Sequence, residues 1–193
     1  MAAFPPTPRA KTVVAPQSYD YITSDTGAGS KARLEVAEQL ITHLARAKPL
    51  VLFPQGFDKD HIYYPCRKGD ISLGQNLADY LKAQPGMDVA EIIHEPRSWT
   101  TRWDIIATYD MVAKQGYDIA HIHFVSDKCH IWRVKIVWWL THPKDWTASF
   151  HFTDQFQMTP FERFVREPIA CVVYAIKLLS WRIFHGRHVP SHS

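Results

Sequence analysis

The chain has 193 residues, of which 46% are hydrophobic and 21% are charged. This length suits a single folded domain, and this composition excludes a disordered protein. Twenty-two basic and 19 acidic residues give a formal net charge of +3, without a dense basic run. Nucleic-acid binding is therefore not expected, because it usually requires a strongly basic surface, whereas a small anionic ligand is compatible with this charge.

The cysteines and the apolar runs of the sequence indicate in which cellular compartment the protein is expected. Three widely spaced cysteines favour reduced thiols over a disulfide framework, and the N-terminus has no apolar run typical of a signal peptide. The most apolar segment, residues 169–184, contains Lys177 and Arg182 and is shorter than the ~20 apolar residues that a membrane span needs. We expect a cytoplasmic protein without a transmembrane helix. The basic residues of this segment leave a peripheral membrane contact as an alternative.

The predicted elements begin after a proline-rich start. Four prolines in residues 1–18 predict an extended arm. Beyond it, short apolar runs alternate with segments of helical periodicity, which predicts a mainly parallel sheet with helices on both faces. The expected strands are residues 19–23, 49–54, 89–94, 119–125 and 146–153. The expected helices are residues 30–47, 71–83, 99–115, 131–140 and a long C-terminal helix to about residue 184. Residues 19–185 thus form one three-layer Rossmann-like α/β domain of about five strands, and residues 186–193 form a loose tail.

Polar residues that follow the expected strands give the candidate site, because the carboxyl ends of parallel strands and the helix N-termini converge at one edge of the sheet. The first such turn is SDTGAGS, residues 24–30. In it, Gly27 and Gly29 would let backbone N–H groups approach a phosphate or carboxylate, with Asp25 and Ser30 beside them. The turn is neither a GxGxxG nor a Walker sequence, so a plain connecting turn is the alternative. Gln55 and Gly56 follow the second strand in the same way.

The segment after the third strand carries Glu95, Ser98 and Thr101. Ser98 or Thr100 is a suitable helix N-cap, and a purely structural role for the segment is the alternative. Glu95 precedes the cap and cannot be a capping-box partner. We therefore expect its carboxylate to bind a ribose or an amine, or to act as a base.

The turn after the fourth strand is SDKCH, and Arg133 follows it. Ser126 or Asp127 is the expected cap of the next helix. His130 and Arg133 lie three residues apart, and so share a helix face near its positive end. Arg133 would then bind an anion and His130 would carry a proton, although an exposed pair without a role is the alternative.

Two other chemistries, metal binding and serine hydrolysis, fit the sequence less well. His121 and His123 are spaced as in some zinc sites, but Cys129 and His130 lie too far along the chain to join them, and no metal is expected. No GxSxG sequence is present. Ser98 or Ser126 with His130 is thus only a loose hydrolase pair.

The order of these motifs resembles the YdcF/SanA/ElyC-like proteins, the domain of unknown function 218 family, over residues 19–175. The Glu-x-x-Ser-x-x-Thr pattern of that family is matched by Glu95, Ser98 and Thr101. Its Val-Thr-Ser…His-x-x-Arg turn resembles the segment from Val125 to Arg133, which contains Ser126 and His130. An arginine-bearing helix with Arg33 and the segments PLVLFPQG, SLGQNLADYL and REPIA complete the order.

The chain also departs from the family pattern. Leu73 stands where an acidic residue is usual, and the Asn-Thr…Glu-Asn run appears as Thr100-Thr101…Trp103-Asp104. The chain resembles the soluble YdcF-like branch, because the N-terminal membrane helix of other members is absent. The resemblance implies a Rossmann-like domain with a polar pocket at the strand ends. It also implies a nucleotide-like ligand such as S-adenosylmethionine.

The expected function is binding of a small anionic or nucleotide-like molecule, as a hydrolase or transferase of a phosphorylated or nucleotide substrate. In that function His130 and Glu95 would be the catalytic groups. The alternative is a non-catalytic, membrane-peripheral factor in cell-envelope maintenance, a role linked to some relatives, with the C-terminal helix as its docking surface.

Overall fold

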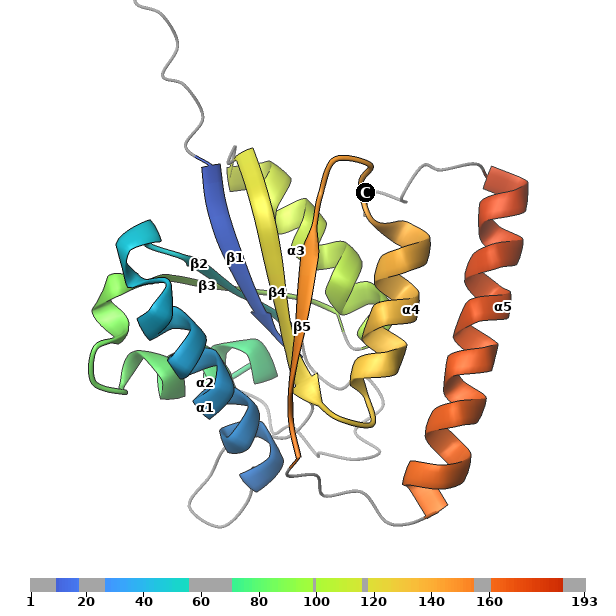
Figure 1. The fold of residues 1–193 in the computed structure, drawn as a ribbon, viewed down its shortest axis with the longest axis horizontal. Helices are drawn as coiled ribbons and strands as arrows, with labels where there is room; N and C mark the ends of the chain where they lie inside the picture. The colour runs from blue at the N-terminus through green and yellow to red at the C-terminus, as the bar shows by residue number, and fades with distance from the viewer. Residues whose placement is uncertain are drawn as a thin grey trace, which may run out of the picture.

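The computed structural model describes residues 10–17, 27–55, 71–98, 100–115, 118–154 and 161–185. These residues form a five-stranded, all-parallel sheet with strand order β3-β2-β1-β4-β5 (Figure 1). The strands are β1 (Ala10–Pro16), β2 (Leu50–Gln55), β3 (Glu91–Ser98), β4 (Asp118–Asp127) and β5 (Ala148–Thr153). The helices are α1 (Ala28–His43), α2 (Leu73–Lys82), α3 (Thr101–Gln115), α4 (Ile131–Thr141) and α5 (Glu167–His185). The predicted parallel α/β fold and the long C-terminal helix are confirmed.

Helices cover both faces of the sheet (Figure 1). One apolar core lies between the sheet and α1 with α2, and a second lies between the sheet and α3 with α4. Successive residues of β1 pack on opposite faces of the sheet. Val13 and Ala15 belong to the core beneath α3 and α4, and Val14 belongs to the core beneath α1 and α2. A central strand covered on both faces is accordingly a continuous apolar run.

The order of the strands reverses between β1 and β4. The chain winds outward from β1 through β2 to β3, then returns to the other side of β1 with β4 and β5. In doubly wound sheets of this kind, ligands bind outside the carboxyl ends of the strands at such a switch point. The topology thus directs attention to the ends of β1 and β4.

The expected extended arm is wrong for residues 10–16, because they form β1, which pairs with both β2 and β4. Prolines suggested an unpaired arm, but the proline φ of about −65° is compatible with extended backbone. Pro16 is the last residue of β1, where a missing N–H costs little pairing. The folded domain therefore begins by residue 10. The expected strand 19–23 and the tail 186–193 lie outside the described residues.

Strand β3 continues to Ser98, so residues 95–98 are strand rather than the expected polar loop. It lies at the edge of the sheet, and β2 is its only partner among the described strands. An edge strand tolerates Pro96, because one side of its backbone needs no ladder hydrogen bond. A short π-helical segment, Glu162–Arg166, leads into α5. Within the described ranges, no helix is both long and apolar enough to cross a membrane.

The start of α2 presses closely on β2. Ser72 caps the helix by accepting a hydrogen bond from Gln75 N at 3.1 Å. A Cβ atom added to Gly74 would lie 2.7 Å from Gln55 O and 2.8 Å from Phe53 O. Both contacts are with backbone atoms of a central strand, which cannot move away cheaply.

We predict that Gly74→Ala lowers the free energy of unfolding by ~1–3 kcal/mol, because the methyl group forces α2 away from β2. Helix propensity alone predicts the opposite sign, since alanine is the better helix former by ~1 kcal/mol. Urea unfolding of both proteins measures the difference. Gly86→Ala is the matched control. The φ of 78° at Gly86 is strained for alanine, but no atom lies within 4 Å of the added Cβ. We therefore expect its free energy of unfolding to fall by only ~1 kcal/mol. An unchanged or higher stability of Gly74→Ala would contradict the steric argument.

Candidate functional site

Four polar residues gather at the carboxyl ends of β1, β2 and β4. Gln17, Gln55, Ser126 and Asp127 are each at most 2% exposed. Gln17 N donates to Val125 O at 2.7 Å, and Gln55 Nε2 donates to Pro16 O at 2.9 Å. These bonds place the ends of the three strands side by side. We call this group of residues the strand-end cluster.

A buried ion pair joins the strand-end cluster to α1. Arg33 Nη2 lies 2.6 Å from Asp127 Oδ2, and Arg33 Nη1 donates to Gln17 O at 3.1 Å. Asp127 Oδ1 accepts hydrogen bonds from the backbone N–H groups of Cys129 and His130, at 2.9 and 2.7 Å. Asp127 rather than Ser126 therefore fixes the turn into α4. The same carboxylate thus joins the second turn of α1 to the start of α4, two helices on opposite faces of the sheet.

Several buried side-chain atoms of the strand-end cluster have no hydrogen-bond partner among the described residues. They are Gln17 Nε2 and Oε1, Gln55 Oε1 and Ser126 Oγ. Leaving a buried polar group unsatisfied costs ~1–3 kcal/mol, and native proteins rarely retain such groups without a reason. Half of the buried unsatisfied side-chain atoms found among the described residues thus lie at the switch point.

A second set of buried polar residues surrounds His130. Its Nε2 lies 3.2 Å from Thr101 Oγ1, at the first residue of α3. Its Nδ1 lies 3.8 Å from Glu167 Oε2, too long for a hydrogen bond but close enough for a strong electrostatic interaction. The three side chains therefore stand in the order hydroxyl, imidazole, carboxylate. All are at most 5% exposed.

Burial decides the charge of His130. It lowers the pKa of His130 more than nearby Glu167 raises it, and the charges of Arg133 and Arg33 lower it further. Burial acts to raise the pKa of Glu167, but His130 and Arg133 outweigh burial and hold it below its usual value. At neutral pH the arrangement thus contains a neutral imidazole beside an ionised carboxylate. A neutral imidazole can accept a proton.

Arg133 is not an open anion clamp. Its Nη2 lies 2.5 Å from Glu167 Oε1, and its guanidinium lies 5.7 Å from the centre of the Tyr174 ring. Sequence reasoning gave no role to Glu167, which is 34 positions from Arg133. Only its place in the REPIA segment at the start of the C-terminal helix could have drawn attention to it.

The structure separates Glu95 from His130. The Glu95 carboxylate pairs with Lys114 Nζ at 3.3 Å, in the last turn of α3, whereas His130 contacts the first residue of that helix. With 15 residues, α3 is about 22 Å long. Glu95 therefore lies towards the other end of α3 and does not join the hydroxyl–imidazole–carboxylate arrangement.

The remaining predicted residues lie at the edges of the strand-end cluster or outside the described chain. Gly27 caps α1 in the left-handed conformation, with φ 85°, and Gly29 and Ser30 are buried in the first turn of that helix. The backbone of Ser98 pairs with Gln55 at the end of β3, but its side chain lies outside the described residues. Asp25 and Gly56 also lie outside them.

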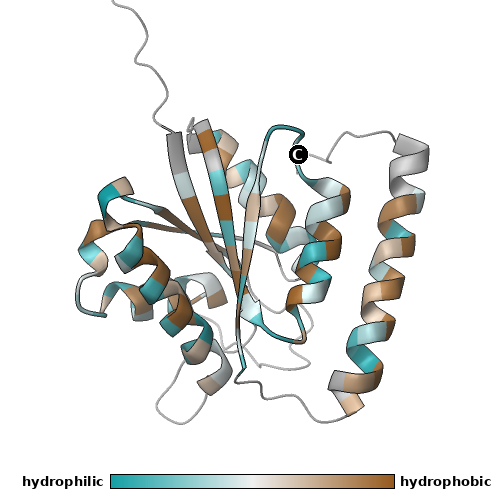
Figure 2. Cartoon of the chain, viewed as in Figure 1, coloured by the Kyte–Doolittle hydropathy of each residue, from teal (hydrophilic) through white to brown (hydrophobic). Residues whose placement is uncertain are grey.

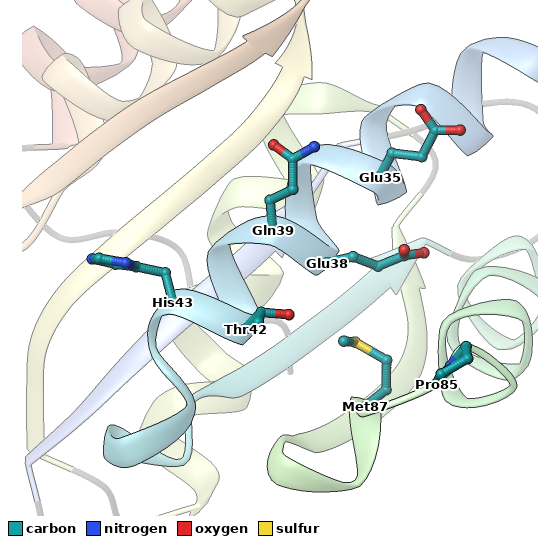
Figure 3. A pocket seen from close by; sticks show the side chains of 7 residues that line it. All are labelled: Glu35, Glu38, Gln39, Thr42, His43, Pro85 and Met87. Atoms are coloured by element: carbon teal, nitrogen blue, oxygen red, sulfur yellow. The ribbon is translucent and has the colours of Figure 1, made fainter.

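Two other polar features are distinct from this site. His121, His123 and His151 cluster on β4 and β5, with His123 Nδ1 3.0 Å from His151 Nε2. Among the described residues, no group of three or more metal-ligating side chains could hold an ion. The other feature is an open hollow of about 620 Å³ between α1 and the loop before β3 (Figure 3). Its lining includes Glu35 and Glu38, which disfavour an anionic ligand.

Fold and site together define an α/β protein of the Rossmann-like class, with a buried polar cluster at its switch point. No protein-family model matches the sequence, and the searches of curated proteins and of solved structures found no match to it either.

We predict that Arg33→Met lowers the free energy of unfolding by ~3–5 kcal/mol, because it leaves the Asp127 carboxylate buried without its cation. Asp127→Asn should have a similar effect, and the double variant should cost less than the sum of the two. Urea unfolding gives all three values. Lys114→Met removes one partner of the pair with Glu95, in which Lys114 is 60% exposed, and should cost less than ~1 kcal/mol. Equal losses at the buried and exposed pairs would contradict this interpretation.

The histidine cluster predicts acid sensitivity. Burial lowers the pKa of His121 and His151, and burial together with its two histidine neighbours lowers that of His123 to about 4. Between about pH 4 and the unfolded value of about 6.5, the folded state binds fewer protons than the unfolded state. The neutral histidines therefore make their full contribution to the free energy of unfolding above pH 6.5. That contribution is lost as the pH falls through this window. Urea unfolding at several pH values should show a shallower dependence in His123→Asn, whereas exposed His43→Asn should behave as wild type.

Proposed function

We propose that this protein binds a small anionic, nucleotide-like molecule at the carboxyl ends of β1, β2 and β4. The observation that carries the proposal is the set of buried polar atoms on Gln17, Gln55 and Ser126 that have no hydrogen-bond partner among the described residues. They lie where the strand order reverses, the usual ligand position in doubly wound sheets. The N-terminus of the 16-residue helix α1 follows β1 and adds positive electrostatic potential for a phosphate or carboxylate.

The charges of the site limit the chemistry of the ligand. Arg33 is paired with Asp127 and Arg133 with Glu167, so each guanidinium is neutralised by a carboxylate. The unpartnered groups are amides and a hydroxyl, which both donate and accept hydrogen bonds. Such groups fit a ligand with mixed donors and acceptors, such as a ribose or base carrying an anionic group. S-adenosylmethionine or another nucleotide is the ligand class that the YdcF-like resemblance also implies.

The arrangement of Thr101, His130 and Glu167 supports a catalytic role beside the bound ligand. Neutral His130 would take the proton of a hydroxyl group, either that of Thr101 or one on the substrate, as its oxygen bonds to the electrophilic phosphorus or carbon. The bond to the leaving group breaks, and His130 returns the proton to that group. Glu167 would stabilise the imidazolium that forms in between. This chemistry belongs to a hydrolase or transferase of a phosphorylated or nucleotide substrate.

We predict that the melting temperature of the purified protein rises with one class among nucleotides, S-adenosylmethionine, sugar phosphates and inorganic phosphate. A ligand at 100 times its Kd adds ~2.7 kcal/mol of stability. Gln17→Met should abolish the shift, yet raise the stability of the free protein, because it replaces unsatisfied buried polar atoms with an apolar chain of similar shape. If Gln17 served only to stabilise the fold, Gln17→Met would instead lower the stability of the free protein.

Two further variants complete the experiment. Gln39→Met changes an exposed position of α1 and should leave both the stability and the ligand shift unchanged. His130→Gln should retain ligand binding but lose turnover if the ligand is a substrate. The binding proposal fails if no ligand class shifts the wild type, or if Gln17→Met keeps the full shift.

A further inference from the structure

The outer face of the C-terminal helix is unusually apolar. Among the described residues, twelve large hydrophobic side chains are exposed, and eight of them lie between residues 161 and 179. Those on the helix proper are Ile169, Val172, Val173, Ile176 and Leu179, at 39% to 62% exposure. Exposed apolar groups are normal when scattered, but their concentration on one element marks an interaction surface. We call these eight residues the α5 outer face.

The opposite side of α5 explains how the helix is held. Leu178 is buried in the core beneath α4, Tyr174 packs against the same core, and Glu167 is buried against Arg133. The helix is therefore fixed to the domain by one side and lies outside α4 as the outermost element (Figure 1). The hydropathy colouring shows apolar residues along its length (Figure 2). The α5 outer face contributes little to the core of its own domain.

The charges of this segment indicate what covers it. Residues 161–185 contain the basic residues Arg163, Arg166, Lys177 and Arg182, and the acidic residues Glu162 and Glu167. Glu167 is buried and already paired with Arg133. Among the side chains of this segment that the structure describes, the exposed charges are those of Arg166 and Lys177, and both are positive. An apolar face bordered by cations is the pattern of helices that lie in the surface of an anionic membrane.

The same charges disfavour a second copy of the chain as the occupant. An antiparallel two-fold pairing centred near Val172 would bring Lys177 of each copy towards Arg166 of the other. Like charges facing each other across an interface are unfavourable. Anionic lipid headgroups, in contrast, complement both residues.

We infer that α5 is an interfacial helix that lies in the surface of a membrane containing anionic lipids. Its apolar outer face would enter the boundary between headgroups and acyl chains, and Lys177 would stay at the headgroup level. The inference does not depend on the proposed ligand site. The two are nevertheless linked in space, because Glu167 in the first turn of α5 contacts Arg133 and approaches His130.

The test is sedimentation of the full-length protein with vesicles of phosphatidylcholine, with and without phosphatidylglycerol. We expect binding to the anionic vesicles, weaker binding at high salt and little binding to phosphatidylcholine alone. Ile176→Gln should weaken binding about tenfold, because one apolar side chain no longer enters the membrane. The matched control is Ile71→Gln, which makes the same change at a 40% exposed position preceding α2, and it should bind as wild type.

Two results would overturn the inference. One is the absence of wild-type binding to anionic vesicles, or equal binding by Ile176→Gln and wild type. The other is a dimer, detected by light scattering without lipid, that Ile176→Gln dissociates, since the α5 outer face would then be a self-association surface. Ile176 is 62% exposed, so its replacement should leave the fold intact, and an unchanged urea midpoint verifies this.

Discussion

The carboxylate of Asp127 is the constraint on which the rest of this structure depends. One oxygen pairs with Arg33 from α1, and the other accepts two backbone hydrogen bonds at the start of α4. Since the two helices cover opposite faces of the sheet, a single buried group fixes both relative to the end of β4. A buried ion pair is stable only when its geometry is good and its remaining lone pairs are satisfied, and Asp127 meets both conditions.

The buried polar residues at the strand ends and around His130 include both ion pairs and uncharged side chains. Arg33 with Asp127 and Arg133 with Glu167 form two charge-balanced ion pairs that hold the helices to the end of the sheet. Gln17, Gln55 and Ser126 retain buried atoms that find no hydrogen-bond partner in the described part of the chain. A protein that needed only stability would place apolar side chains at these positions. Polar groups held in place by a rigid frame are the general design of a ligand site.

The two sides of α5 differ: one is buried against the domain and the other is exposed. Its inner side supplies Glu167 and Leu178 to the domain, while its outer side exposes Ile169, Val172 and Ile176. A helix that packs on one neighbour only would normally be polar on its free side. The departure from that rule is concentrated here, whereas α1 and α2 bury their apolar residues against the sheet. This exposed apolar surface is the observation on which the proposed membrane contact of α5 rests.

Much of the fold could be predicted from local patterns. Alternating apolar runs and helical periodicities predicted the parallel sheet, and four of the five strands were expected close to where they lie. The strand β1 was missed, because its apolar run TVVA is short and lies among prolines. Its central place is decided by pairing with β2 and β4, which are distant in sequence.

The candidate site was predictable only in part, and the division has a physical reason. Sequence alone determined that polar residues follow the strands and begin the helices, because strand direction and helix polarity place them at one edge. Only the tertiary structure decided which of them meet. It paired Arg33 with Asp127, set Glu167 beside His130 and Arg133, and left Glu95 with Lys114. Long-range pairing and burial depend on how the helices pack across the sheet, and no local sequence pattern encodes that packing.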